Sequence, residues 1–194
     1  MKVYILGGFL GSGKTTLLMR MATKFSEECK KVTIIVNEAA DIGVDGNTLK
    51  AEGYNSIELP NGCICCTLAS SLHDAMENIK KDLDPDIVIV EPTGLALPDQ
   101  VADIIRPTLK DGDSEMIIGV TDIQRYKDLI KRKEEFFKKQ MNGSKFLLIN
   151  KCDLASKEDI EETEKYLKEC FPNKDVIPVS VKTGENLDTL FGLM

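Results

Sequence analysis

The stretch GGFLGSGKTT, residues 7–16, constrains the fold of this chain more than any other feature of its sequence. Gly8 to Thr15 match the pattern G-x-x-x-x-G-K-[ST], and they lie between a short β-branched run and a helical pattern. In such a loop, backbone N–H groups surround phosphate oxygens, and the N-terminus of the following helix adds a favourable dipole. The alternative is a glycine-rich turn with a chance lysine. The strand and helix on either side favour nucleotide binding over that alternative.

Each residue type in this loop has a separate task. Gly11 and Gly13 permit positive φ angles and a close approach of the backbone to a ligand. Lys14 is expected to reach the β- and γ-phosphates as a catalytic residue, and Thr15 is expected to bind Mg²⁺. The residues of the loop predicted to bind the nucleotide are Gly8, Gly11, Ser12, Gly13, Lys14, Thr15 and Thr16.

Short apolar runs alternate with longer helical patterns along the whole chain. The predicted strands are 2–6, 31–36, 86–90, 115–120, 145–150 and 175–180, with a further short candidate at 56–59. The predicted helices are 14–28, 67–82, 98–106, 123–140 and 156–170. Several strands are apolar on both faces, as in a parallel sheet covered by helices. The pattern predicts an α/β fold with a doubly wound, mostly parallel sheet in three layers, the P-loop NTPase architecture, as one domain over residues 1–194.

Composition excludes several classes of partner. The net charge of −7 argues against a broad surface for nucleic acid or for an anionic membrane. No stretch approaches the roughly 20 apolar residues that cross a bilayer. The N-terminus lacks the apolar region and cleavage site of a signal peptide. We therefore expect a cytoplasmic protein that binds neither nucleic acid nor membrane.

The run DIVIVEPTGLALP holds a second candidate site at the end of a predicted central strand. Small GTPases carry D-x-x-G at this place, and here the corresponding residues are Glu91 to Gly94. A carboxylate there holds Mg²⁺ through water, and the glycine N–H can sense the γ-phosphate. We predict a catalytic and Mg²⁺-binding role for Glu91 and nucleotide binding by Gly94. The alternative, an acidic residue at the end of an edge strand, fits poorly with the apolar run that precedes it.

The run LLINKCDL indicates which base is bound. Asn150, Lys151 and Asp153 form the N-K-x-D pattern of GTPases, again after an apolar strand. A carboxylate at Asp153 can accept from guanine N1–H and the 2-amino group, whereas adenine would leave it unpaired. The stem of Lys151 can lie along the base plane. A further loop resembles the last guanine-contacting segment of such proteins, and its predicted nucleotide-binding residues are Ser180, Val181 and Lys182. An ATP-dependent kinase is disfavoured by Asp153 and by the lack of a recognisable lid.

Three cysteines crowd into the stretch NGCICCTL, at positions 63, 65 and 66. Such a cluster in a cytosolic protein more often indicates metal binding or catalysis than a disulfide. Cys63, Cys65 and Cys66 suit Zn²⁺ or another borderline divalent ion. A redox cluster and a structural zinc loop remain open as alternatives. The scattered Cys29, Cys152 and Cys170 are expected to be buried small hydrophobes.

Taken together, these motifs make the chain resemble the GTPase domain of CobW-type proteins, which are related to the nickel-maturation GTPases of hydrogenase and urease. The matching segments are GGFLGSGKTTLL, VNEAADIGVDG, NGCICCTL and E-x-x-G in place of D-x-x-G, followed by NKCD. The likeness runs from residue 3 to about 190. There are departures from the family pattern. Ala40 stands where the family usually has glycine, and longer members continue into a second domain after the GTPase domain, whereas this sequence stops at LFGLM.

The resemblance implies a GTP-dependent metallochaperone or metal insertase. Its cofactors would be GTP or GDP and Mg²⁺, with Zn²⁺ or Co²⁺ as the transferred metal and Ni²⁺ as a third candidate. Its partner would be a client metalloprotein or a cofactor-assembly protein, and a homodimer is open. Glu38, with a catalytic role, and Asp45, with a metal-binding role, would lie in the switch segment near Mg²⁺ or the attacking water. The competing hypothesis is a GTP-dependent metal or redox sensor with negligible turnover.

Overall fold

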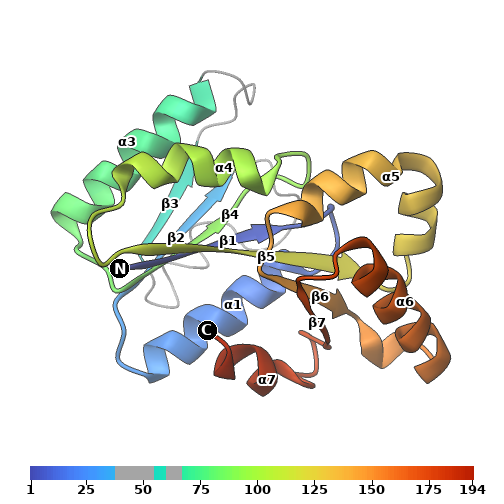
Figure 1. Cartoon of the computed structure of the whole chain (residues 1–194). Coiled ribbons are helices and arrows are strands. Elements are labelled where there is room, and N and C mark those ends of the chain that lie inside the picture. Colours follow the sequence, from blue (N-terminus) through green and yellow to red (C-terminus); the bar gives the residue numbers. More distant parts are fainter. Residues whose placement is uncertain (38–54, 60–66) are drawn as a thin grey trace.

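A parallel β-sheet forms the centre of the computed structural model, which describes residues 1–37, 55–59 and 67–194. Within those residues the sheet has seven strands, and every strand pair is parallel (Figure 1). In spatial order the strands are β3 (Asn55–Leu59), β2 (Val32–Asn37), β4 (Ile87–Glu91), β1 (Lys2–Gly7), β5 (Ser114–Asp122), β6 (Phe146–Asn150) and β7 (Asp175–Pro178). The predicted strand at 56–59 is confirmed as the edge strand β3. The predicted doubly wound parallel fold is confirmed.

Helices cover both faces of this sheet. The helices are α1 (Lys14–Glu27), α3 (Thr67–Asp82), α4 (Pro98–Ile105), α5 (Tyr126–Asn142), α6 (Lys157–Cys170) and α7 (Leu187–Gly192), with single 3₁₀ turns η1 (Arg106–Thr108) and η2 (Cys152–Leu154). Figure 1 shows α1 and α7 on one side of the sheet and α3, α4 and α5 on the other. The arrangement gives three layers, as predicted.

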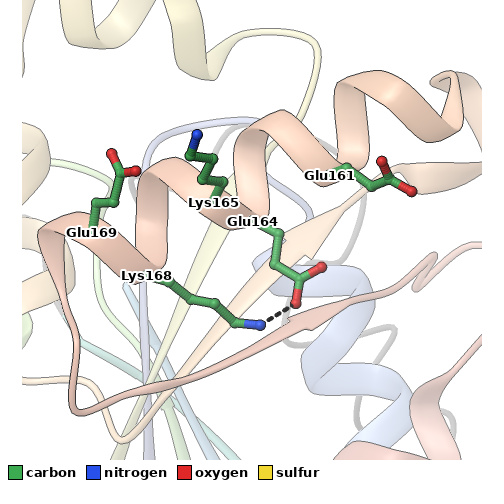
Figure 2. A pocket seen from close by; sticks show the side chains of 5 residues that line it. All are labelled: Glu161, Glu164, Lys165, Lys168 and Glu169. Carbon is green, nitrogen blue, oxygen red and sulfur yellow. Dashed lines mark hydrogen bonds and ion pairs between the residues drawn. The ribbon is translucent and has the colours of Figure 1, made fainter.

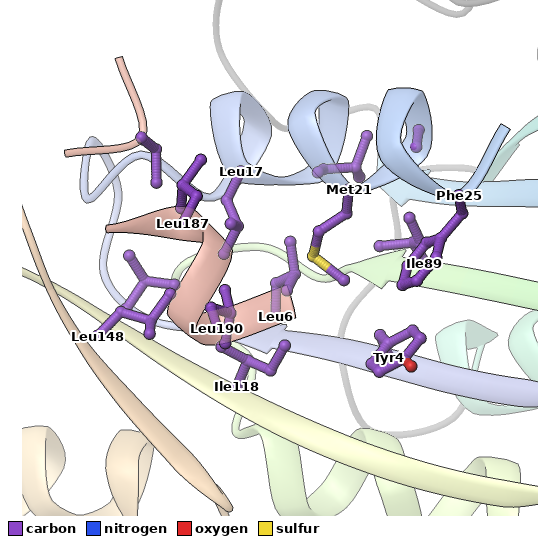
Figure 3. Packing of buried hydrophobic residues seen from close by; sticks show 14 of the residues in the cluster. Tyr4, Leu6, Leu17, Met21, Phe25, Ile89, Ile118, Leu148, Leu187 and Leu190 are labelled. Atoms are coloured by element: carbon purple, nitrogen blue, oxygen red, sulfur yellow. The ribbon is translucent and has the colours of Figure 1, made fainter. Parts of the chain in front are cut away.

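Strand β1 supplies the centre of the core on both faces. Tyr4 and Leu6 face α1 and α7, and Figure 3 shows them packed with Leu17 and Met21 of α1 and Leu190 of α7. The alternate β1 residues, Val3 and Ile5, belong to the cluster on the opposite face. Successive side chains of a strand point to opposite faces, so a strand buried on both sides must be apolar at every position. This burial fixes β1, and with it the loop that follows.

Some boundaries differ from the predictions. Helix α7 was not predicted, because six residues are too few for the periodic pattern to emerge. Helix α5 begins later than predicted and has a kink at Lys133, where φ is −148° and ψ is 42°. Strand β7 ends at Pro178, two residues before the predicted end, although the Val179 N–H still donates to the Ile149 carbonyl oxygen.

The cysteine predictions were wrong in one case. Cys29 is exposed, because the chain leaves the end of α1 there in a left-handed conformation with a φ of 58°. Cys152 is buried as predicted, and Cys170 is half-buried. Burial raises the pKa of the Cys152 thiol to about 11, and its Sγ donates to the Ile149 carbonyl oxygen at 3.1 Å. Cys152 therefore packs as a small apolar side chain rather than as a reactive thiol.

The outer surfaces of two helices are strongly charged. Figure 2 shows five charged side chains on the exposed face of α6, among them the ion pair of Glu164 with Lys168 one turn later. In α5 the charged run at 131–139 is exposed while Phe137 between the charges is buried. Both patterns are those of solvated helix faces. Among the helices of the described residues, none has the length and apolarity that a membrane crossing requires.

A partly buried ion pair connects α3 to the loop before β5. The ammonium of Lys80 lies 2.7 Å from Asp113 Oδ2 and also donates to the Thr108 carbonyl oxygen. Burial alone would raise the pKa of Asp113, but the hydrogen bonds from Lys80 and from the Lys110 backbone outweigh it and hold that pKa well below its usual range. The Asp113 carboxylate is therefore protonated less readily in the folded protein than in the unfolded chain.

We expect Asp113→Asn to lower the free energy of unfolding by about 1–3 kcal/mol at pH 7, because it removes hydrogen bonds to a charged group. The stabilisation is present above the unfolded pKa and is lost as the pH falls through the lower folded pKa. The difference between variant and wild type should therefore shrink below about pH 4. Urea unfolding at pH 7 and pH 3 measures it, with the exposed Asp111→Asn as the control. A difference that stays constant over this range would contradict the assignment.

Candidate functional site

The phosphate loop predicted from the sequence joins β1 to α1 at the carboxyl edge of the sheet. Gly11 and Gly13 adopt the predicted positive φ angles, 76° and 99°. A Cβ atom at Gly13 would lie 2.2 Å from the side-chain Nδ2 of Asn150, so this position excludes any larger residue. Two of the predicted sites, the loop and the N-K-x-D segment, are therefore in direct contact.

Lys14 is the first residue of α1 and is 5% exposed. Its ammonium donates to two carbonyl oxygens of its own loop, those of Gly8 at 3.1 Å and Phe9 at 3.2 Å. Burial lowers the pKa of Lys14, while the nearby charge of Glu91 opposes that change. The side chain thus lies folded into the loop, with its cation beside the backbone groups that surround phosphates in this motif.

Thr15 and Glu91 form the most informative contact of the site. The Thr15 hydroxyl donates to Glu91 Oε1 at 2.9 Å, and Glu91 is 4% exposed. Burial raises the pKa of Glu91, and the Lys14 charge and the Thr15 hydrogen bond counteract that rise. The second oxygen, Oε2, is buried and has no hydrogen-bond partner in the described structure. A buried carboxylate oxygen without a partner is costly unless a ligand satisfies it. A hydroxyl and a carboxylate are the hard oxygen ligands that Mg²⁺ takes, directly or through water, so these residues fit that ion.

The E-x-x-G segment after β4 lies against the phosphate loop. A Cβ atom at Gly94 would come within 2.6 Å of the backbone nitrogen of Leu10, so the two backbones touch. Parallel pairing of β1 with β4 brings both loops to the same edge of the sheet. The structure thus brings Glu91 and Gly94 to the loop that holds Lys14 and Thr15.

Asn150 connects the base segment with two other loops. Its Nδ2 donates to the Ser12 carbonyl oxygen at 2.7 Å, and its Oδ1 accepts from the Val181 backbone N–H at 3.0 Å. The side chain is 1% exposed, so both of its polar atoms are satisfied by protein. One amide therefore fixes the phosphate loop, the end of β6 and the 180–182 segment relative to one another.

The remaining predicted base contacts lie around the same strand end. Asp153 is exposed in η2, and Lys151 precedes it with a left-handed φ of 68°. Ser180 is buried, and its hydroxyl accepts from the Thr183 backbone N–H at 3.2 Å, which closes the last loop. Lys182 is exposed. The carboxylate of Asp153 is thus accessible to a ligand, while its neighbours in sequence are fixed.

Three residues of the site escaped the sequence analysis. Asp122 ends β5 and pairs with Lys151 at 2.6 Å, and Arg20 of α1 donates to the carbonyl oxygens of Val181 and Lys182. Gln140 of α5 contacts the phosphate loop. Asp122 could have been found from the sequence, because it is an acidic residue at the end of an apolar strand, as Glu91 is. Arg20 and Gln140 lie inside helices, where the sequence shows only a polar position.

Several predicted residues lie outside the described part of the chain. They are Glu38, Asp45, Cys63, Cys65 and Cys66. Within residues 1–37, 55–59 and 67–194, no group of three or more His, Cys, Asp or Glu side chains is arranged to hold a metal. The thiol site therefore stays a prediction.

Curated proteins with similar sequences include two with roles in metal handling by name. Zinc chaperone YeiR of Escherichia coli (strain K12) is 27% identical over 164 residues, which cover 84% of this chain and 50% of that protein. Zinc-regulated GTPase metalloprotein activator 1 of Schizosaccharomyces pombe is 32% identical over 173 residues, which cover 80% of this chain and 40% of that protein.

Solved structures show the same fold. HypB from Helicobacter pylori in complex with nickel aligns with a TM-score of 0.71 at 17% identity, over 98% of this chain and 84% of that one. The chain spans about half the length of the curated relatives it matches. Residues 2–178 match the family described as CobW/HypB/UreG, nucleotide-binding domain. With its phosphate loop, Thr15–Glu91 pair and N-K-x-D segment in one place, the chain belongs to this family.

Proposed function

We propose that this chain is a GTP-binding and GTP-hydrolysing metallochaperone domain that delivers a divalent metal to a client protein. The observation that carries the proposal is the hydrogen bond from Thr15 to the buried carboxylate of Glu91, whose second oxygen has no hydrogen-bond partner among the described residues. Relatives named zinc chaperone and zinc-regulated GTPase metalloprotein activator support the same function.

The phosphates would bind in the loop between β1 and α1. The Gly8 N–H already donates to Gln140, so the backbone N–H groups beyond it, up to Thr16, would surround the phosphate oxygens. Lys14 would exchange its two carbonyl partners for the β- and γ-phosphates. Thr15 and Glu91 would hold Mg²⁺, which when bound would neutralise charge on the β- and γ-phosphates. The backbone N–H of Gly94 would sense the γ-phosphate.

The base would bind beyond Asn150, which already fixes the adjoining loops. Asp153 would accept from guanine N1–H and the 2-amino group, and the stem of Lys151 would lie along the base plane. The ion pair with Asp122 holds Lys151 in place for this task. Ser180, Val181 and Lys182 would complete the base site.

The transferred metal is a separate ligand from Mg²⁺. We propose Zn²⁺ first, since relatives are named zinc chaperones, with Co²⁺ and Ni²⁺ as further candidates. Cys63, Cys65 and Cys66 would bind it, and Glu38 and Asp45 would act between this site and the phosphates. The partner would be a client metalloprotein or a cofactor-assembly protein in the cytoplasm. It would bind this domain or a homodimer of it.

GTP and GDP should bind at least ~100-fold more tightly than ATP and ADP, because adenine would leave the Asp153 carboxylate unpaired. Asp153→Asn should weaken guanine binding and favour xanthine nucleotides, whose ring offers the complementary groups. Calorimetric titration with each nucleotide measures this, with the exposed Asp159→Asn on α6 as the control. Equal affinities for guanine and adenine nucleotides would rule out the assignment.

Lys14→Ala and Thr15→Ala should lower kcat for GTP hydrolysis by at least ~10²-fold, since both groups act on charge at the phosphates. Glu91→Gln should reduce turnover more than binding. It should also fold, because burial already disfavours the charged form of Glu91. Steady-state phosphate release gives the rates, and Lys24→Ala at the exposed end of α1 serves as the control. A wild-type rate in Lys14→Ala would show that the loop is not catalytic.

Metal affinity should depend on the nucleotide if the thiols and the γ-phosphate are coupled. We expect Zn²⁺ or Co²⁺ to bind about 5–150-fold more tightly with a non-hydrolysable GTP analogue than with GDP. Replacing Cys65 and Cys66 with serine should remove that difference, whereas Cys29→Ser should keep it. Competition against a chromophoric chelator in both nucleotide states measures the affinities. If the wild type binds the metal equally tightly with the GTP analogue and with GDP, the cysteines have a structural or redox role instead. If the metal controls partner binding while GTP is not hydrolysed, the sensor hypothesis is favoured.

A further inference from the structure

Gln140 of α5 connects the two loops that meet around the phosphates. It is 1% exposed, although its neighbours Lys138 and Lys139 face solvent. Its Oε1 accepts from the Gly8 backbone N–H at 3.1 Å. Its Nε2 donates to the Ala96 carbonyl oxygen at 2.8 Å and lies 3.4 Å from that of Gly94. One side chain therefore bridges the start of the phosphate loop and the loop that follows Glu91.

The chemistry of an amide suits this bridge. Gly8 offers a donor, while Ala96 and Gly94 offer acceptors, so the side chain in between must accept at one end and donate at the other. This requirement also fixes which end of the amide is oxygen. An apolar side chain of the same size would leave the Gly8 N–H and the Ala96 carbonyl unpaired in a buried place.

The bridge lies where small displacements matter. Gly94 touches the backbone of Leu10 in the phosphate loop, and its N–H is the proposed contact to the γ-phosphate. A nucleoside diphosphate has no γ-phosphate and so cannot make this contact with Gly94. Any restraint on the loop after Glu91 therefore affects binding of a triphosphate more than binding of a diphosphate.

We propose that Gln140 is a positioning residue that holds the Gly94 loop ready for the γ-phosphate, and so sets the preference for triphosphate over diphosphate. The inference rests on the proposed GTP-binding function. Without the Gln140 bridge, the Gly94 loop would lose more conformational entropy when it binds the γ-phosphate, which weakens triphosphate binding. The contacts of a nucleoside diphosphate with the phosphate loop would remain.

The test compares Gln140→Met with the wild type. The measured quantity is the ratio of the dissociation constants for GDP and for a non-hydrolysable GTP analogue, with kcat for GTP in parallel. We expect the preference for the analogue to fall about tenfold and kcat to fall with it, while GDP affinity changes less than about threefold. Gln140→Asn, which keeps an amide but is too short to reach both loops, should behave in the same way and serves if the first variant unfolds.

Thr163→Val is the matched control. Thr163 is equally buried, on α6, and its hydroxyl donates to the Asp159 carbonyl oxygen. Removing the Thr163 hydroxyl should lower the unfolding temperature, as Gln140→Met does. It should leave the preference for the GTP analogue over GDP unchanged. An unaltered preference in both Gln140 variants, or an equal loss for both nucleotides, would overturn the inference while the wild-type protein still binds GTP. Failure of the wild type to bind guanine nucleotides would overturn the proposed function and this inference together.

Discussion

Parallel pairing of β1 with β4 is the constraint on which the site depends. The pairing runs through Ile5 and Val90, and it brings the residues after both strands to one edge of the sheet. Thr15 therefore meets Glu91, and Gly94 meets Leu10, although neither pair is close in sequence. Apolar packing around Tyr4 and Leu6 on one face of β1, and around Val3 and Ile5 on the other, holds this geometry. The polar site is thus kept in register by apolar packing beneath it.

The sequence allowed the fold and much of the site to be predicted because both follow local rules. A strand such as β4, apolar from Ile87 to Val90, must be covered on both faces, and the glycines around Lys14 match a loop with fixed geometry. Acidic or amide residues at strand ends, such as Glu91 and Asn150, then fall at the carboxyl edge by topology alone. The same reasoning would have found Asp122.

The features that escaped prediction depend on tertiary contacts. Gln140 and Arg20 lie on helices and reach the site across the space between elements, so their roles follow from packing rather than from any motif. Helix α7 is a single short element whose apolar residues, Leu187 and Leu190, are recognisable only against α1. The left-handed turn at Cys29 likewise reflects how α1 ends. The roles of Cys63, Cys65 and Cys66 remain predictions.

The close approach of Gly13 to Asn150 has a consequence for how this chain can change over time. A side chain at position 13 would collide with the amide that links the phosphate loop to the 180–182 segment. Shortening the residue at position 150 would relieve the collision but would leave the Ser12 carbonyl and the Val181 N–H without a partner. Neither position can be replaced singly without loss, and a double replacement must pass through one of the damaged single forms. The phosphate loop at Gly13 and the base segment at Asn150 are therefore expected to evolve together.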